Sequence, residues 1–172
     1  MKKLLLFSFA LLAFMACDLN KLADDIQDSL SSFDASVSGD VTSSFSGSAE
    51  FVNSYVQSQN PQGSNLLVNM DNSSDPDESL ALTIVLTGVQ NGVPTGTYTY
   101  DLNNPDVLIT AAYTLNSDSF TVPDPTATNQ IVITKVENTR VEGTFNLTLA
   151  SLAGGKVTVT GSFKAIGIYQ TI

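Results

Sequence analysis

The sequence predicts an all-β fold, and three observations support this class. From residue 45 onward, apolar residues recur at every second position, which is the period of a half-buried β-strand. Turn signals such as Asn91-Gly92 and Pro123-Asp124-Pro125 separate the apolar segments at short intervals. The chain is also rich in Thr, Ser, Val, Asn and Gly, which favour strands and turns. About eight or nine short strands with short connections favour an antiparallel β-sandwich, with a lipocalin-like up-and-down barrel as the alternative.

The first residues of the chain have the pattern of a secretion signal. Two lysines precede an apolar run over residues 4–15, which is shorter than the roughly 20 residues of a membrane-spanning helix. The run ends at Phe14-Met15-Ala16-Cys17, which resembles the lipobox of bacterial lipoproteins, although Phe14 stands where Leu is usual. We therefore expect residues 1–16 to be a lipoprotein signal peptide. An ordinary signal peptide that is cut elsewhere is the alternative.

Cys17 is the expected lipidation site. It is the only cysteine, so the chain offers it no disulfide partner, and acylation would consume a thiol that is otherwise reactive. Each buried CH₂ of an acyl chain contributes about 0.8 kcal/mol, so several chains hold a protein firmly on a membrane. We expect a lipid-anchored protein of the bacterial cell envelope, in the outer membrane. Its periplasmic or surface orientation stays open.

Residues 17–44 are expected to form a lipidated tether. Within it, four apolar residues recur at helical spacing, which predicts a short amphipathic helix over residues 18–30; a disordered tether is the equal alternative, because so short a helix is marginal alone. The apolar residues are Leu19, Leu22, Ile26 and Leu30. Residues 31–44 are dominated by Ser, Asp and Gly, which is typical of a flexible spacer. The single β-domain is then expected over residues 45–172.

The β-domain is expected to begin with a strand in which Phe45, Gly47, Ala49 and Phe51 share one face. The clearest strand covers residues 140–150, where a slip of one residue would turn the whole apolar row into water. Gly161 is expected at a bulge or bend near the end of the chain. Further strands are predicted over residues 66–70, 80–86, 96–100, 107–115, 131–136, 157–160 and 162–169.

Three segments near the C-terminus combine apolar and polar residues: Ile133-Thr134-Lys135-Val136, Val141-Glu142-Gly143-Thr144-Phe145, and the segment from Val157 to Phe163. These segments are similar to those of small Bacteroidota lipoproteins of uncharacterised function. The Asn that often precedes Gly in the last segment is missing, since Thr160 runs directly into Gly161. The resemblance covers about the last quarter of the chain and the signal region. It implies a β-rich fold and an envelope location, and it brings no catalytic residues.

The charge and composition exclude several classes of function. The chain has 17 acidic and 7 basic residues, a net charge of −10, so it lacks the basic surface that nucleic acid requires. There is no histidine, and once Cys17 is acylated there is no thiol, so the commonest general base and the best nucleophile are missing. We therefore expect no enzymatic activity and no cofactor.

One acidic segment is a weak candidate for calcium. Between Asp71 and Glu78 the chain carries carboxylate and amide oxygens, the ligands that Ca²⁺ prefers. The spacing is not that of an EF-hand, and Pro76 restricts the backbone, so a solvated loop is the default interpretation. The four candidate ligands are Asp71, Asp75, Asp77 and Glu78.

The tyrosines are the remaining candidates for ligand contact. If exposed, they could stack against sugars or line a cavity, but strand pairs and rim positions are the favoured interpretation. They are Tyr55, Tyr98, Tyr100, Tyr113 and Tyr169. The sequence as a whole predicts a membrane-anchored, non-catalytic β-domain that contacts a protein or a glycan. The alternative is a lipocalin-like carrier of a small apolar ligand.

Overall fold

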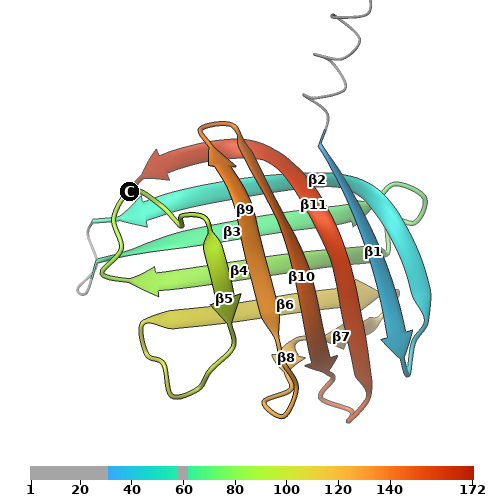
Figure 1. The fold of residues 1–172 in the computed structure, drawn as a ribbon. Coiled ribbons are helices and arrows are strands. Elements are labelled where there is room, and N and C mark those ends of the chain that lie inside the picture. The colour runs from blue at the N-terminus through green and yellow to red at the C-terminus, as the bar shows by residue number, and fades with distance from the viewer. Residues whose placement is uncertain (1–30, 58–61) are drawn as a thin grey trace, which may run out of the picture. The chain divides into compact units, whose positions relative to one another are not determined.

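The structure is a computed structural model that describes residues 31–57 and 62–172 (Figure 1). Strands form all of its regular structure, and these residues contain no helix, so the all-β prediction is confirmed. The strands are β1 (Ser32–Gly39), β2 (Ser43–Val56), β3 (Gly63–Asn72), β4 (Glu78–Thr87), β5 (Gly96–Thr99), β6 (Val107–Leu115), β7 (Asp118–Phe120), β8 (Val122–Pro123), β9 (Gln130–Glu137), β10 (Arg140–Ala150) and β11 (Lys156–Thr171).

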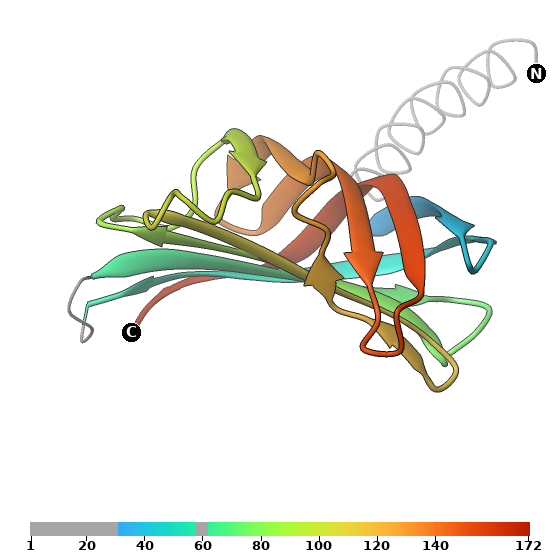
Figure 2. The same cartoon turned by 90° about the horizontal axis from the view of Figure 1, so that it is seen from below.

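The strands of residues 31–57 and 62–172 belong to one sheet, in the order β5-β9-β10-β11-β1-β2-β3-β4-β6-β7, with β8 paired to β10. The sheet folds over itself, so that β9, β10 and β11 cross in front of β2, β3, β4 and β6 (Figures 1 and 2). The two layers expected of a sandwich therefore come from a single sheet. This sheet is not closed, which distinguishes it from the alternative up-and-down barrel.

Strand β1 joins the two layers. It pairs antiparallel with β11 on one side and with β2 on the other. Where β1 begins, β11 and β2 meet directly and run in parallel, from Ile166 opposite Glu50 to Thr171 opposite Tyr55. The C-terminal halves of these two long strands thus lie side by side beyond the start of β1.

The interpretation of residues 31–44 as a flexible spacer is wrong. Phe33, Ala35 and Val37 are buried on one face of β1, and the compact unit begins at Ser31 rather than at residue 45. The polar residues between them occupy the outer face, which gave the segment its spacer-like composition. Three alternating apolar residues are enough here because β1 has a hydrogen-bonded neighbour on each side.

The core between the layers contains a row of aromatic rings. Phe33 and Phe45 make an edge-to-face contact at 5.2 Å, and Tyr113 lies 5.7 Å from Phe45 and 6.1 Å from Phe120, measured between ring centroids. Such pairs contribute about 0.5–1.5 kcal/mol each beyond the burial of their area. Around the rings, the largest fully buried side chains include Leu66, Met70, Leu80, Leu82, Ile84, Ile109, Ile131, Ile133, Leu147 and Leu149.

The predicted register of β10 is confirmed, because its residues from Val141 to Leu149 alternate between buried and outward positions. The expected bulge at Gly161 is not present: β11 continues through this residue, which pairs with Ala35 and Phe145. The glycine serves a close approach instead, since a Cβ there would lie 2.7 Å from Cζ of Phe145. A register shift occurs at Glu142/Gly143, between β10 and β9.

Several predictions lie outside the described residues. They are the signal peptide over residues 1–16, the lipidation site Cys17 and the amphipathic helix over residues 18–30. In the part of the chain that is described, no helix has the length and hydropathy needed to cross a membrane.

Candidate functional site

The outer face of β10, β11, β1 and β2 carries a dense array of hydroxyl and amide side chains. Side chains along a strand alternate between the two faces, so the residues between the buried apolar positions all point outward. We call this surface the hydroxyl face. It consists of Asp34, Ser36 and Ser38 on β1, Ser44 and Ser46 on β2, Thr144, Asn146 and Thr148 on β10, and Thr158, Thr160 and Ser162 on β11.

Strand register aligns these side chains in rows that run across the sheet. Neighbouring strands are about 4.8 Å apart, so each row presents polar groups at a regular short spacing. One row is Thr144, Ser162, Asp34 and Ser46, and the next is Asn146, Thr160, Ser36 and Ser44. A third row, Thr148, Thr158 and Ser38, spans three strands.

Two adjoining grooves cross the hydroxyl face. The first has a volume of about 470 Å³ and lies over β1, β2 and β11, with Asp34 as the one charged residue in its lining. The second, of about 300 Å³, extends the surface over β9 and β10 and adds Glu142 and Lys164. The grooves share Asp34 and Ser162, so together they form one continuous depression.

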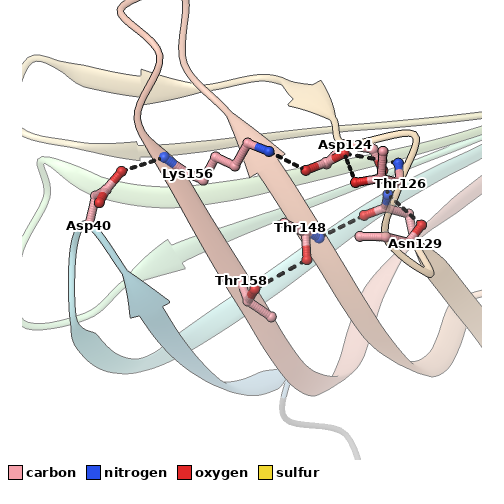
Figure 3. Close-up of polar contacts among 8 residues, drawn as sticks. Asp40, Asp124, Thr126, Asn129, Thr148, Lys156 and Thr158 are labelled. Carbon is pink, nitrogen blue, oxygen red and sulfur yellow. Dashed lines mark hydrogen bonds and ion pairs between the residues drawn. The ribbon is translucent and has the colours of Figure 1, made fainter.

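One end of the hydroxyl face is held by an ion pair (Figure 3). Nζ of Lys156, at the start of β11, lies 2.6 Å from Oδ2 of Asp124, and the backbone N–H of Lys156 donates to Asp40 at 2.7 Å. Asp124 Oδ1 also accepts hydrogen bonds from the backbone N–H and the hydroxyl of Thr126. Hydrogen bonds from Lys156 and Thr126 to the charged form hold the pKa of the Asp124 carboxyl well below its usual range.

The same network fixes the connection between β8 and β9. Asn129 is buried; its Nδ2 donates to the backbone oxygen of Asp124 at 2.7 Å, and its Oδ1 accepts from the backbone N–H of Thr148 at 2.6 Å. Thr148 and Thr158 then share a hydroxyl contact of 3.1 Å across β10 and β11. These contacts link β10, β11 and the β8–β9 connection at this end of the face.

The acidic segment does not assemble a calcium site. Glu78 begins β4 and is 3% exposed; its Oε1 accepts from the Tyr113 hydroxyl at 2.7 Å, and its Oε2 accepts from Nδ2 of Asn72 at 2.7 Å. Asp75 caps the turn by accepting from the backbone N–H of Asp77 at 3.0 Å, while Asp71 is exposed on β3. Across residues 31–57 and 62–172, no three acidic, histidine or cysteine residues are grouped as metal ligands would be. Grouping Asp71, Asp75, Asp77 and Glu78 was wrong because Glu78 points into the core.

Most of the tyrosines belong to the core. Tyr55, Tyr98 and Tyr113 are buried, and their hydroxyls donate to Gln62, the backbone of Pro94 and Glu78, respectively. Burial, followed by the contact with Glu78, raises the pKa of Tyr113, and burial raises that of Tyr98. Tyr100 packs partly buried against the core. Tyr169, near the end of β11, is 37% exposed and is the remaining candidate for stacking.

The other layer presents an apolar outer row. Ile168 of β11 pairs with Val52 of β2, which pairs with Leu67 of β3. Leu67 pairs in turn with Thr83 of β4, and a second apolar pair, Val85 of β4 with Leu108 of β6, lies two residues farther along β4. Ile168 and Leu108 are each about half exposed, so this surface differs in character from the hydroxyl face.

Comparisons with protein-family models, with curated proteins and with solved structures found no match to this chain.

Proposed function

We propose that the protein is a membrane-anchored, non-catalytic module of the bacterial envelope whose hydroxyl face binds a neutral polysaccharide. The observation that carries this proposal is the continuous groove pair, in which Ser and Thr hydroxyl groups line up in rows across four strands. Each hydroxyl both donates and accepts hydrogen bonds, as the hydroxyls of a sugar do. A regular array of such groups suits an extended polymer that repeats the same chemistry.

The charge of the protein favours a neutral polymer. The chain carries a net charge of −10, and the charged residues that line the groove pair are the carboxylates Asp34 and Glu142 and the ammonium group of Lys164. An acidic polysaccharide or a nucleic acid would therefore be repelled by the protein's overall field. Neutral sugar hydroxyls, by contrast, can donate to Asp34.

Binding without catalysis is supported by the carboxylates themselves. Glycoside hydrolysis generally uses two carboxyl groups on either side of the scissile bond. The groove pair contains two carboxylates, Asp34 and Glu142, and the Glu142 carboxylate is held in an ion pair with Arg140. The chain also has no histidine that could act as a general base in place of Glu142.

The membrane anchor is supported by the sequence pattern that ends at Cys17 and by the resemblance to envelope lipoproteins. Its test is growth of the producing cells with labelled palmitate. The label should appear on the wild-type chain and be absent from the Cys17→Ser variant, which should also leave the membrane fraction. Labelling of the variant, or its unchanged membrane partition, would contradict the anchor.

Polysaccharide binding can be tested by affinity electrophoresis of the purified full chain. Native gels would contain a neutral glucan, mannan or xylan, or polygalacturonate as the acidic counterpart. We expect retarded migration in at least one neutral gel and none in polygalacturonate. Unchanged migration in all neutral gels would exclude the proposal.

Contact with a protein is a second candidate, which the apolar outer row favours. Exposed apolar patches on soluble domains often mark such contacts. This candidate requires that Leu108→Asp and Ile168→Asp disrupt a complex in envelope extracts while polysaccharide binding is unchanged. An apolar-ligand carrier finds no comparable support, because side chains such as Tyr113 and Leu66 fill the space between the layers.

A further inference from the structure

A separate pocket lies near the C-terminal end of β11, away from the hydroxyl face. Its volume is about 250 Å³, and it collects side chains from four segments that are far apart in the sequence. These segments are β2, the connection from β4 to β5, the β9–β10 hairpin and β11. The lining residues are Asn53, Asn91, Val136, Glu137, Asn138 and Tyr169.

Buried polar side chains fix the β4–β5 connection as one wall of this pocket. Asn53 is 1% exposed; its Nδ2 donates to the backbone oxygen of Val93 at 3.1 Å, and its Oδ1 accepts from the N–H of Val93 at 2.8 Å. The Ser64 hydroxyl accepts from the N–H of Gly92 at 3.1 Å and donates to the backbone oxygen of Val89 at 2.8 Å. Hydrogen bonds within the protein thus position the β4–β5 connection without a ligand.

The turn at the tip of this connection presents Asn91 beside the pocket. Asn91 and Gly92 have φ angles of 68° and 82°, a left-handed pair typical of a tight Asn-Gly turn. A Cβ at Gly92 would lie 2.8 Å from Cε2 of Tyr169, so the tyrosine ring packs closely against the glycine. The backbone of Tyr169 also pairs with that of Asn53 across the parallel strands β11 and β2, and this pairing fixes the position of the Tyr169 Cα atom beside Asn53.

The β9–β10 hairpin forms the opposite wall. The N–H of Gly167 donates to the backbone oxygen of Thr139 at 3.2 Å, which ties the hairpin to β11 two residues before Tyr169. This contact places Glu137 and Asn138 in the pocket lining with Tyr169. Glu137 is steadied by an ion pair with Lys135 at 3.0 Å.

We propose that this pocket binds one ring of a neutral sugar, with Tyr169 as the stacking platform. The choice of ligand class rests on the proposed function, whereas the pocket is independent of the hydroxyl face. The C–H groups on one side of a pyranose ring match the negative face of an aromatic ring. Asn91 and Asn138 supply amide donors and acceptors for the sugar hydroxyls, and Glu137 supplies an acceptor. The Glu137 carboxylate disfavours uronic acids.

Titration of the full chain with short sugars tests this assignment. The probes are tetrasaccharides of glucose, mannose, xylose and N-acetylglucosamine. Their binding is measured by isothermal titration calorimetry at sugar concentrations up to the millimolar range. We expect at least one to bind. Tyr169→Ala should then weaken binding by at least about tenfold, and Tyr169→Phe should retain it, because the ring rather than the hydroxyl makes the contact.

The controls separate loss of the pocket from loss of the fold. Asn138→Ala changes an exposed hairpin residue and should weaken binding, while Asn69→Ala, exposed on the outer face of β3, should not. Thr110→Arg, at an exposed position on β6 outside the pocket and the hydroxyl face, should leave tetrasaccharide affinity within about twofold.

The assignment would be overturned if none of the four tetrasaccharides bound. It would also be overturned if Tyr169→Ala and Asn138→Ala bound the sugar as tightly as the wild-type protein does. Retained polysaccharide binding in that case would leave the proposed function intact. Conversely, tetrasaccharide binding without polysaccharide retention would support the pocket and remove the role of the hydroxyl face.

Discussion

The hydroxyl of Tyr113 donates a 2.7 Å hydrogen bond to Oε1 of Glu78 inside the aromatic row of the core. The second carboxyl oxygen of Glu78, Oε2, accepts a hydrogen bond from Asn72. Burial of a carboxyl group is costly unless it is hydrogen-bonded, and here both oxygens of Glu78 have a partner. This relationship removes Glu78 from the acidic surface and makes it a structural residue of the core.

Tyr113→Phe should therefore destabilise the protein by about 1–3 kcal/mol, because it leaves Oε1 of the buried Glu78 without its donor. Urea denaturation of the wild-type and variant proteins measures the change. Tyr55→Phe is the matched control, since the Tyr55 hydroxyl donates to Gln62, an exposed residue, and its loss should cost less. Equal costs for the two variants would contradict the structural role of Glu78.

The ion pair between Asp124 and Lys156 should make stability depend on acid pH. Because the pKa of Asp124 is lower in the folded state, its charged form stabilises the fold fully above the unfolded value of about 3.9. This contribution should be lost progressively as the pH falls below that value. Asp124→Asn should accordingly be less stable than the wild type at neutral pH, with a difference that shrinks as the pH falls below about 3.9.

Urea midpoints at about pH 7 and about pH 3 measure this difference. Asp118→Asn, exposed on β7, serves as the control and should show little difference at either pH. A constant gap between Asp124→Asn and the wild type across this range would show that the carboxylate charge is not what stabilises the β8–β9 connection.

Strand β1 should be essential to the domain, because it joins the two layers. Phe33→Ala removes a buried ring that contacts Phe45 and should cost about 3–5 kcal/mol. Ser36→Ala, on the outer face of the same strand, should change stability by less than about 0.5 kcal/mol. Chemical denaturation distinguishes the two; similar small effects would indicate that residues 31–44 are a spacer after all.

Gly92 should be more sensitive to substitution than a glycine with the same backbone conformation elsewhere. Gly92→Ala introduces strain at a φ of 82° and also places a Cβ 2.6 Å from Oδ1 of Asn53. Gly88→Ala, at a φ of 74°, meets nothing within 4 Å and should cost only the strain, about 1–2 kcal/mol. The larger loss in melting temperature for Gly92→Ala would demonstrate the tight packing around Tyr169, and equal losses would refute it.

Much of the fold follows from alternation that is visible in the sequence. Strands β4, β6 and β10 were predicted because their apolar residues occupy every second position over a long run. Strand β1 was missed because Phe33, Ala35 and Val37 are separated by Ser and Asp, and the composition outweighed the period. The apolar residues of β1 do alternate with polar ones, but three such residues identify a strand only when the strands that pair with it are known.

The candidate sites depend on contacts that no local pattern reveals. The partners Asp40 and Lys156 are 116 positions apart, and the Tyr169 pocket combines four segments. The five tyrosines are indistinguishable by residue type, yet Tyr169 near the end of β11 is exposed, whereas Tyr113 of β6 points into the core between the layers. The hydroxyl rows likewise require the register of β1, which the sequence interpretation lacked.

The most direct test of glycan binding is a pair of variants compared by affinity electrophoresis in the neutral polysaccharide that retards the wild-type chain. Thr160→Arg fills the first groove, whereas Thr110→Arg makes the same change at an exposed position on β6. We predict that Thr160→Arg weakens retention by at least about tenfold and that Thr110→Arg migrates as the wild type does. Equal retention of the two variants would contradict binding at the hydroxyl face.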